Sequence, residues 1–99
     1  AQEVAAVREV LEGTGLPALT LIEPIEYIDW VFPWQRELIR KRCHFFLMAT
    51  DAERTSPQTA EGIMACEWTT APDAMRRIKY ANTRKVLKRA SHIVASRAT

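Results

Sequence analysis

The sequence has only two cysteines, no internal repeat and no long apolar run. Cys43 and Cys66 do not form a CxxC pair, which argues against a zinc site or a redox pair built from them. Each lies among apolar residues, so we expect buried free thiols in a reducing cytoplasm rather than a disulfide. The longest apolar run, residues 45–49, is far shorter than the ~20 residues of a membrane-spanning helix. These absences favour a cytoplasmic protein that does not span a membrane.

The length and composition are those of a single globular domain. The 99 residues are 47% hydrophobic and 26% charged, which argues against a second domain, a disordered tail or a low-complexity segment. We therefore expect one domain over residues 1–99.

Charge is distributed unevenly along the chain, although the net charge is only +2. Residues 1–70 carry 6 basic and 11 acidic groups, whereas residues 71–99 carry 8 basic groups and 1 acidic group. A cationic C-terminal third fits either an anionic partner or a basic helix face exposed to solvent.

The N-terminal residues have the spacing of an amphipathic helix. Apolar residues recur at i, i+3 and i+7 from Val4 to Leu11, which predicts a helix over residues 2–12 that stops before Gly15. Glu9 and Glu12 then stand about 60° apart around the helix, away from the apolar stripe. Two carboxylates placed in this way can point at one metal ion.

The remainder of the chain alternates between strand-like and helical patterns. We expect a hairpin made of a strand over residues 18–32, broken by Pro24 and ended by Pro33, a polar turn over 34–39 and a strand over 40–50. A loop over residues 51–60 and a further strand over 63–69 should follow. The chain should then form a short helix that ends at Ile78 and a long helix capped by Asn82 or Thr83. In the first strand, the even-numbered residues 26–32 share one side and the odd-numbered residues 25–31 the other. This order predicts a mixed α/β fold with helices packed on a sheet.

Residues Arg8 to Leu16, with the sequence Arg-Glu-Val-Leu-Glu-Gly-Thr-Gly-Leu, resemble the second half of the Nudix box. This signature of the Nudix hydrolases is Gly, five residues, Glu, seven residues, then Arg-Glu-U-x-Glu-Glu-x-Gly-U, where U is a bulky aliphatic residue. Counting seven residues back from Arg8 reaches Ala1, so the Glu that leads the box would precede the chain. The resemblance implies the family's α/β/α sandwich without its N-terminal strands, in a chain that is either a fragment or part of a longer sequence. Loss of those strands would leave an open sheet edge, which a homodimer would cover.

The resemblance also implies a reaction and a metal site. Nudix hydrolases cleave a nucleoside diphosphate linked to a second group X, using Mg²⁺ or Mn²⁺ and a water that attacks phosphorus. Carboxylate-bound hard cations suit this chemistry because they neutralise the charge of a pyrophosphate. The implied roles are metal ligand and catalytic residue for Glu9 and Glu12, further metal ligand for Glu61, and structural residue for Arg8 and Gly15. The alternative is that these three glutamates are solvated surface residues.

Cations that bind substrate phosphates are expected on the strand over residues 40–50. Arg40 and Arg42 are the favoured contacts, because a central strand can project alternate residues into a cleft. The basic residues of the last helix, within 84–89, are the alternative, although such a helix face is more typical of solvated surface. The expected partner is thus a small phosphorylated molecule rather than a nucleic acid or a membrane.

Gly13 stands where the family carries the second Glu of its Glu-Glu pair. It either removes one metal-binding carboxylate or serves to end the helix. Three functions remain open: a Mg²⁺-dependent hydrolase, a Nudix-like module with weakened catalysis that binds a ligand or regulates, and a nucleic-acid adaptor that uses the basic helix. The third ranks last, because no base-reading motif accompanies the charges.

Overall fold

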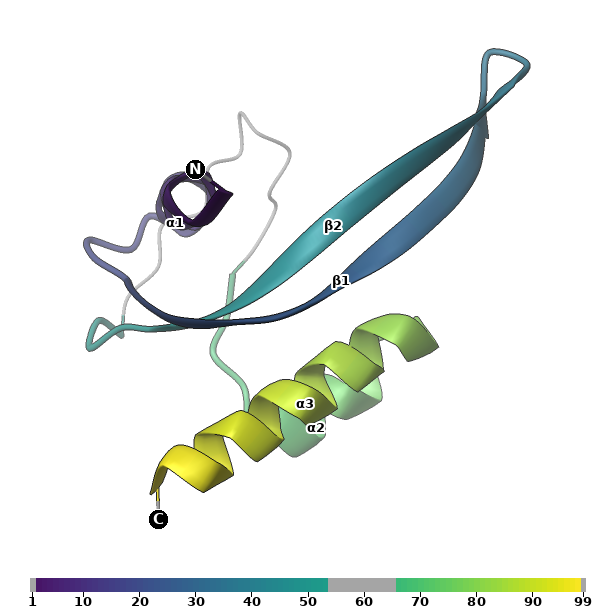
Figure 1. Ribbon diagram of the computed structural model, residues 1–99. Coiled ribbons are helices and arrows are strands. Elements are labelled where there is room, and N and C mark those ends of the chain that lie inside the picture. The colour runs from purple at the N-terminus through teal and green to yellow at the C-terminus, as the bar shows by residue number, and fades with distance from the viewer. Residues whose placement is uncertain (1, 54–65, 99) are drawn as a thin grey trace. The chain divides into compact units, whose positions relative to one another are not determined.

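The computed structural model describes residues 2–53 and 66–98. Within these ranges it contains helix α1 (Gln2–Thr14), strands β1 (Thr20–Trp34) and β2 (Glu37–Ala49), and helices α2 (Ala71–Arg77) and α3 (Ala81–Ala98) (Figure 1). The strands β1 and β2 pair with each other in one sheet. The mixed α/β fold predicted from the sequence is confirmed.

The chain forms two compact units, each made of two segments. Unit 1 comprises Ala1–Glu23 and Phe46–Thr70, and unit 2 comprises Pro24–Phe45 and Ala71–Thr99. Unit 1 therefore contains α1 and the base of the β1–β2 hairpin, whereas unit 2 contains the outer part of the hairpin with α2 and α3.

Helix α1 ends at a glycine in the left-handed conformation. Gly15 has a φ of 72°, and its N–H donates to the Leu11 carbonyl at 2.9 Å. This bond from the residue after the helix to the carbonyl four residues earlier is a common helix cap, and it favours glycine because a Cβ would be strained there. The Thr14 hydroxyl adds a bond to the Val10 carbonyl at 2.7 Å. Gly15 therefore terminates the helix, and Gly13 is an interior helical residue.

A two-residue turn joins β1 to β2. Gln35 and Arg36 have φ values of 47° and 68°, the combination found in a type I′ hairpin turn. The strand β1 continues through Pro24 and past Pro33 to Trp34. Proline is tolerated because, within the described ranges, β1 pairs on one side only, and a missing N–H on the open side breaks no ladder bond. The predicted six-residue turn and the predicted strand breaks at the prolines are therefore wrong.

Side-chain pairs define the register of the outer hairpin. Asp29 faces Arg42, and Tyr27 faces His44, with each partner equally far from the turn. Since all four lie on one face, the opposite face carries Ile28 and the even-numbered residues of β1, as the sequence alternation predicted.

The core of unit 2 forms where the second hairpin face meets the helices. Ile28, Val86 and Ala90 are buried. At the edge of this core, the half-buried ring of Trp30 meets the exposed ring of Tyr80 edge-on, with 5.4 Å between centroids. Helices α2 and α3 contact each other (Figure 1).

The long helix α3 begins earlier than predicted. The Arg84 N–H donates to the Tyr80 carbonyl at 3.0 Å, so helical bonding starts before Asn82 and Thr83, and neither of these residues caps the helix. The Arg84 guanidinium also donates to the Ile78 carbonyl at 2.8 Å, where it satisfies a carbonyl just beyond the end of α2.

The strand predicted over residues 63–69 is not found in the part that the structure describes. Cys66 to Thr70 have no regular secondary structure, and residues 63–65 lie outside the described ranges. Both cysteines are free, as expected, but each is half-buried rather than buried.

Candidate functional site

The acidic residues of the candidate site lie on α1 in unit 1. Glu9 and Glu12 are both exposed, and their i, i+3 spacing on a continuous helix places them one turn apart. Arg8 is exposed beside them and forms no ion pair with the described residues. Neither carboxylate belongs to a group of three or more His, Cys, Asp or Glu side chains within residues 2–53 and 66–98. The described part of the site therefore offers two carboxylates that solvent and a ligand can reach.

The segment after the undescribed residues contacts the end of α1. The Cys66 thiol donates a long hydrogen bond to the Gly13 carbonyl, with 4.0 Å between sulfur and oxygen. Gly13 is itself buried. Two residues further along, Trp68 Nε1 donates to the Glu53 carbonyl at 2.6 Å. These bonds tie residues 66–68 to the C-terminal turn of α1 and to the chain just after β2.

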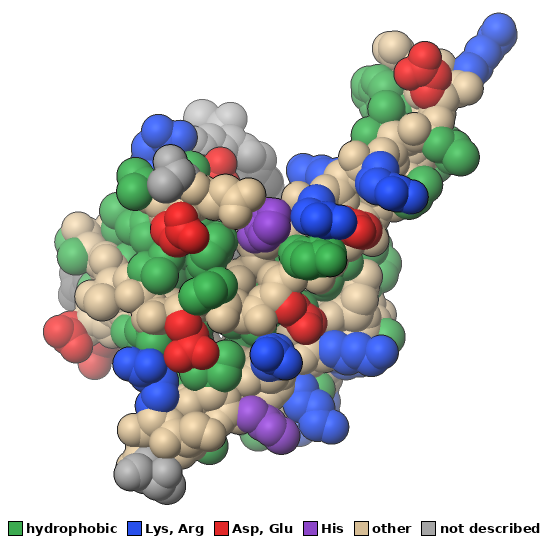
Figure 2. Space-filling view, in the orientation of Figure 1, with side chains coloured by type: hydrophobic (Ala, Val, Ile, Leu, Met, Phe, Trp, Pro, Cys, Tyr) green, Lys and Arg blue, Asp and Glu red, His purple; other side chains and the backbone are tan. Residues whose placement is uncertain are grey.

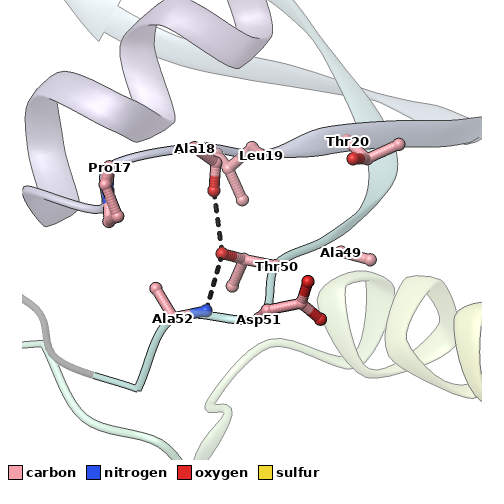
Figure 3. Close-up of a pocket in the computed structure, with 8 residues that line it drawn as sticks. All are labelled: Pro17, Ala18, Leu19, Thr20, Ala49, Thr50, Asp51 and Ala52. Carbon is pink, nitrogen blue, oxygen red and sulfur yellow. Dashed lines mark hydrogen bonds between the residues drawn. The ribbon is translucent and has the colours of Figure 1, made fainter.

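A small hollow lies at the base of the hairpin, also in unit 1 (Figure 3). The Thr50 hydroxyl donates to the Ala18 carbonyl at 2.8 Å and accepts from the Ala52 N–H at 3.2 Å. These two bonds link the chain before β1 to the chain after β2, which form the two sides of the hollow. Its volume is about 260 Å³, and its lining residues are Pro17, Ala18, Leu19, Thr20, Ala49, Thr50, Asp51 and Ala52. Ligand pockets for drug-sized molecules are typically ~300–1,000 Å³, so this hollow admits part of a ligand at most.

The two arginines expected to bind phosphate lie on β2 in unit 2. Arg42 already has a carboxylate partner, since its Nε and Nη2 donate to the two Asp29 carboxylate oxygens at 2.8 and 3.1 Å. Its guanidinium also lies over the Tyr27 ring, 4.0 Å from the centroid. Arg40 is exposed on the same strand face and adds positive charge near Asp29. A phosphate would therefore compete with Asp29 for Arg42 but not for Arg40.

The pKa values of this pair are displaced in the direction that stabilises the ionised forms. The hydrogen bond from Arg42 lowers the pKa of Asp29, with smaller coulombic contributions from Arg42, Arg40 and His44. The reciprocal hydrogen bond to Asp29 raises the pKa of Arg42. Both side chains are solvent-exposed, so salt screens this interaction.

The model of the NUDIX domain matches residues 2–90, almost the whole chain. The chain belongs to the Nudix family. No curated protein and no solved structure matches it significantly. The Nudix match begins at Gln2, the first residue of α1, so it includes the two carboxylates, Gly13 and the Gly15 cap. The family is one of hydrolases that act on nucleoside diphosphates linked to another group.

The predicted Nudix-site residues are divided between the two units. Glu9, Glu12, Arg8 and Gly15 lie within or directly after α1, and Arg40 and Arg42 lie in the other unit. Glu61 lies outside the described residues.

No helix in the described ranges is both long enough and apolar enough to cross a membrane.

The sequence interpretation missed the residues around the end of the Nudix helix. Cys66, Thr50 and Trp68 link segments that are far apart in the sequence, and none of them belongs to a recognisable motif. An apolar strand pattern around Cys66 was the only signal available, and it indicated the wrong local structure.

Proposed function

We propose that the chain is a Mg²⁺-dependent pyrophosphohydrolase that acts on a nucleoside diphosphate linked to a second group. The observation that supports this proposal most directly is the pair of exposed carboxylates, Glu9 and Glu12, one turn apart on the helix that Gly15 terminates. Membership of the Nudix family supports the proposed class of reaction, hydrolysis of a nucleoside diphosphate linked to a second group.

The carboxylates suit a hard cation. Mg²⁺ prefers oxygen ligands and is commonly held by one or two carboxylates together with substrate phosphates and water. Glu9 and Glu12 supply the two carboxylates, and Glu61 is the candidate for a third. When bound, the cation supplies charge neutralisation at the pyrophosphate and an activated water.

In the proposed reaction, the oxygen of a water molecule forms a bond to one phosphorus atom while the bridging P–O bond breaks. The leaving phosphate departs with the electron pair, and the products are two phosphate monoesters when the second group is a sugar or a nucleoside. Glu9 orients the water and accepts its proton, which requires that its carboxylate be exposed to the substrate side. Of the two arginines on β2, Arg40 is the better candidate to bind a phosphate, because it is exposed and no bidentate carboxylate holds its charge, whereas Arg42 is available only if Asp29 releases it.

Glu9→Gln and Glu12→Gln test this proposal in the full chain. With Mg²⁺ and a panel of nucleoside diphosphates linked to sugars, nucleosides or phosphate, the wild type should release phosphate monoesters. Glu9→Gln should lower kcat by roughly 10²–10⁴-fold. Glu3→Gln removes an exposed carboxylate from the first turn of the same helix and should leave kcat unchanged. No product from the wild type across the panel, or equal loss in all three variants, would contradict the proposal.

A second candidate function follows from Gly13. Because this position lacks a carboxylate and is buried, the described site has fewer metal ligands than the family motif, which favours a module that binds a nucleotide without turnover. Two measurements separate the two functions: calorimetric titration with Mg²⁺ and a non-hydrolysable nucleoside diphosphate reports binding, and incubation with the hydrolysable compound reports turnover. Binding of the analogue without product from the hydrolysable compound supports the module, and binding together with product supports the hydrolase.

A further inference from the structure

Helix α3 carries a row of cations on one side. Lys85, Lys88, Arg89 and His92 follow one another at i, i+3, i+4 and i+7, and all four are exposed. At 100° per residue these positions form one stripe over two helical turns, about 10 Å long. Figure 2 shows Lys and Arg side chains gathered over the part of the surface where Figure 1 draws α3.

Acidic residues are nearly absent around this stripe along the chain. The helix α3 itself contains none, and residues 71–99 contain 8 basic residues and 1 acidic residue. That acid, Asp73, pairs with Arg76 within α2. The cations of the stripe therefore have no carboxylate on their own helix to neutralise them, and their field favours an anion.

The stripe is longer than a single pyrophosphate needs. Its cations recur once per helical turn, which suits an anion with repeated charges better than one small substrate. Most of the apolar side of α3 is already covered: Val86 and Ala90 are buried inside unit 2, and Val94, further along the same side, is exposed. A helix that binds a bilayer inserts a row of exposed apolar side chains, and one exposed valine does not supply such a row, so the stripe fits a membrane poorly.

We propose that the stripe of Lys85, Lys88, Arg89 and His92 binds the phosphodiester backbone of a double-stranded nucleic acid. The stripe contains no Phe, Tyr or Trp side chain to serve as a stacking platform for unstacked bases, which favours a duplex over a single strand. Lysine and arginine contacts to phosphate carry no sequence information, so binding is independent of base sequence. The inference is separate from the proposed hydrolase activity, because it uses no residue of α1.

Fluorescence anisotropy of the full chain with short labelled DNA and RNA duplexes tests this inference. Each phosphate contact contributes about −0.9 to the slope of log K against log salt concentration, so three permanent cations predict a slope of roughly −2.7 between about 50 and 200 mM salt. The triple variant Lys85→Gln, Lys88→Gln, Arg89→Gln should bind about tenfold more weakly or worse, with a slope near zero. Glutamine has nearly the same helix propensity as lysine and arginine, so α3 should stay folded.

A matched control removes the same charge from other parts of unit 2. The variant Arg36→Gln, Lys41→Gln, Lys79→Gln takes away three exposed cations and should retain most of the affinity and the slope. Equal loss in both triple variants would show a general charge effect and overturn the proposal. Capture of the chain by phosphatidylserine vesicles but by neither duplex would overturn it in favour of a membrane surface. Comparing the two duplexes then identifies whether RNA or DNA is preferred.

Discussion

Cys66 donates its thiol hydrogen to the carbonyl of Gly13, the residue that stands where the Nudix box carries a glutamate. Gly13 is buried in α1, and Cys66 contacts its carbonyl oxygen. A side chain at position 13 would therefore have to enter a buried position beside the segment that contains Cys66. We expect the lack of a carboxylate at this position and the close approach of Cys66 to be coupled.

Gly13→Ala should test the packing at this position without changing the charge. In an open helix interior this substitution usually stabilises by about 1 kcal/mol, whereas overpacking costs about 1–3 kcal/mol. We expect Gly13→Ala to give no gain in the free energy of unfolding, and to give a gain when it is combined with Cys66→Ala. Urea unfolding of the four proteins in this cycle measures the coupling. Additive effects would show that Cys66 does not restrict position 13.

The same pair governs Mg²⁺ affinity in the proposed function. Gly13→Glu alone should not tighten Mg²⁺ binding, because its carboxylate is excluded from its position, whereas Gly13→Glu with Cys66→Ala should bind Mg²⁺ more tightly than the wild type. Calorimetric titration with the cation measures both. Gly13→Gln with Cys66→Ala is the control of equal shape without charge, and tight binding by that variant would contradict a ligand role at position 13.

Gly15→Ala should destabilise the end of the Nudix helix. Gly15 has a φ of 72°, and an L-residue with a Cβ loses about 1–2 kcal/mol in this conformation. Gly15→Asn should cost less, because asparagine tolerates the left-handed region better. Chemical denaturation monitored by circular dichroism measures both changes. An alanine variant as stable as the wild type would contradict the cap.

The local features of the site could be predicted from the sequence, and the long-range ones could not. Spacing within one helix determines where Glu9 and Glu12 lie, and a glycine after the last turn is a local signal for its end. The contact between Cys66 and Gly13 joins residues far apart in the chain, so no periodicity encodes it. The pairing of Asp29 with Arg42 depends on the hairpin register, which the predicted six-residue turn misplaced.

The turn itself was missed because its residues are unusual for its geometry. Asn-Gly is the strong signal for a type I′ turn, and here Gln35 and Arg36 occupy both left-handed positions. Replacing them by Gln35→Asn and Arg36→Gly should stabilise the hairpin by about 1–2 kcal/mol, since each residue relieves strain at positive φ. Hydrogen exchange of the amides near the tip of β1 and β2 measures the local gain. Unchanged or faster exchange would argue against a type I′ turn.

The ion pair of Asp29 and Arg42 gives the outer hairpin an acid-dependent stability. The pKa of Asp29 is lowered in the folded chain below its ordinary value of 3.8, chiefly by the hydrogen bond from Arg42. Because the pKa of Asp29 is lower in the folded chain than in the unfolded chain, the ion pair stabilises the folded chain fully at a pH above the pKa of the unfolded chain. This stabilisation is lost as the pH falls through the pKa of the folded chain. Asp29→Asn should therefore unfold with a shallower dependence on pH below about 4 than the wild type does.

Carboxyl carbon chemical shifts report the Asp29 titration directly, and thermal unfolding from neutral to acidic pH reports the stability. Glu26→Gln, an exposed carboxylate on the other face of β1, is the control; if it flattens the acid dependence as much as Asp29→Asn does, the effect does not come from the pair with Arg42.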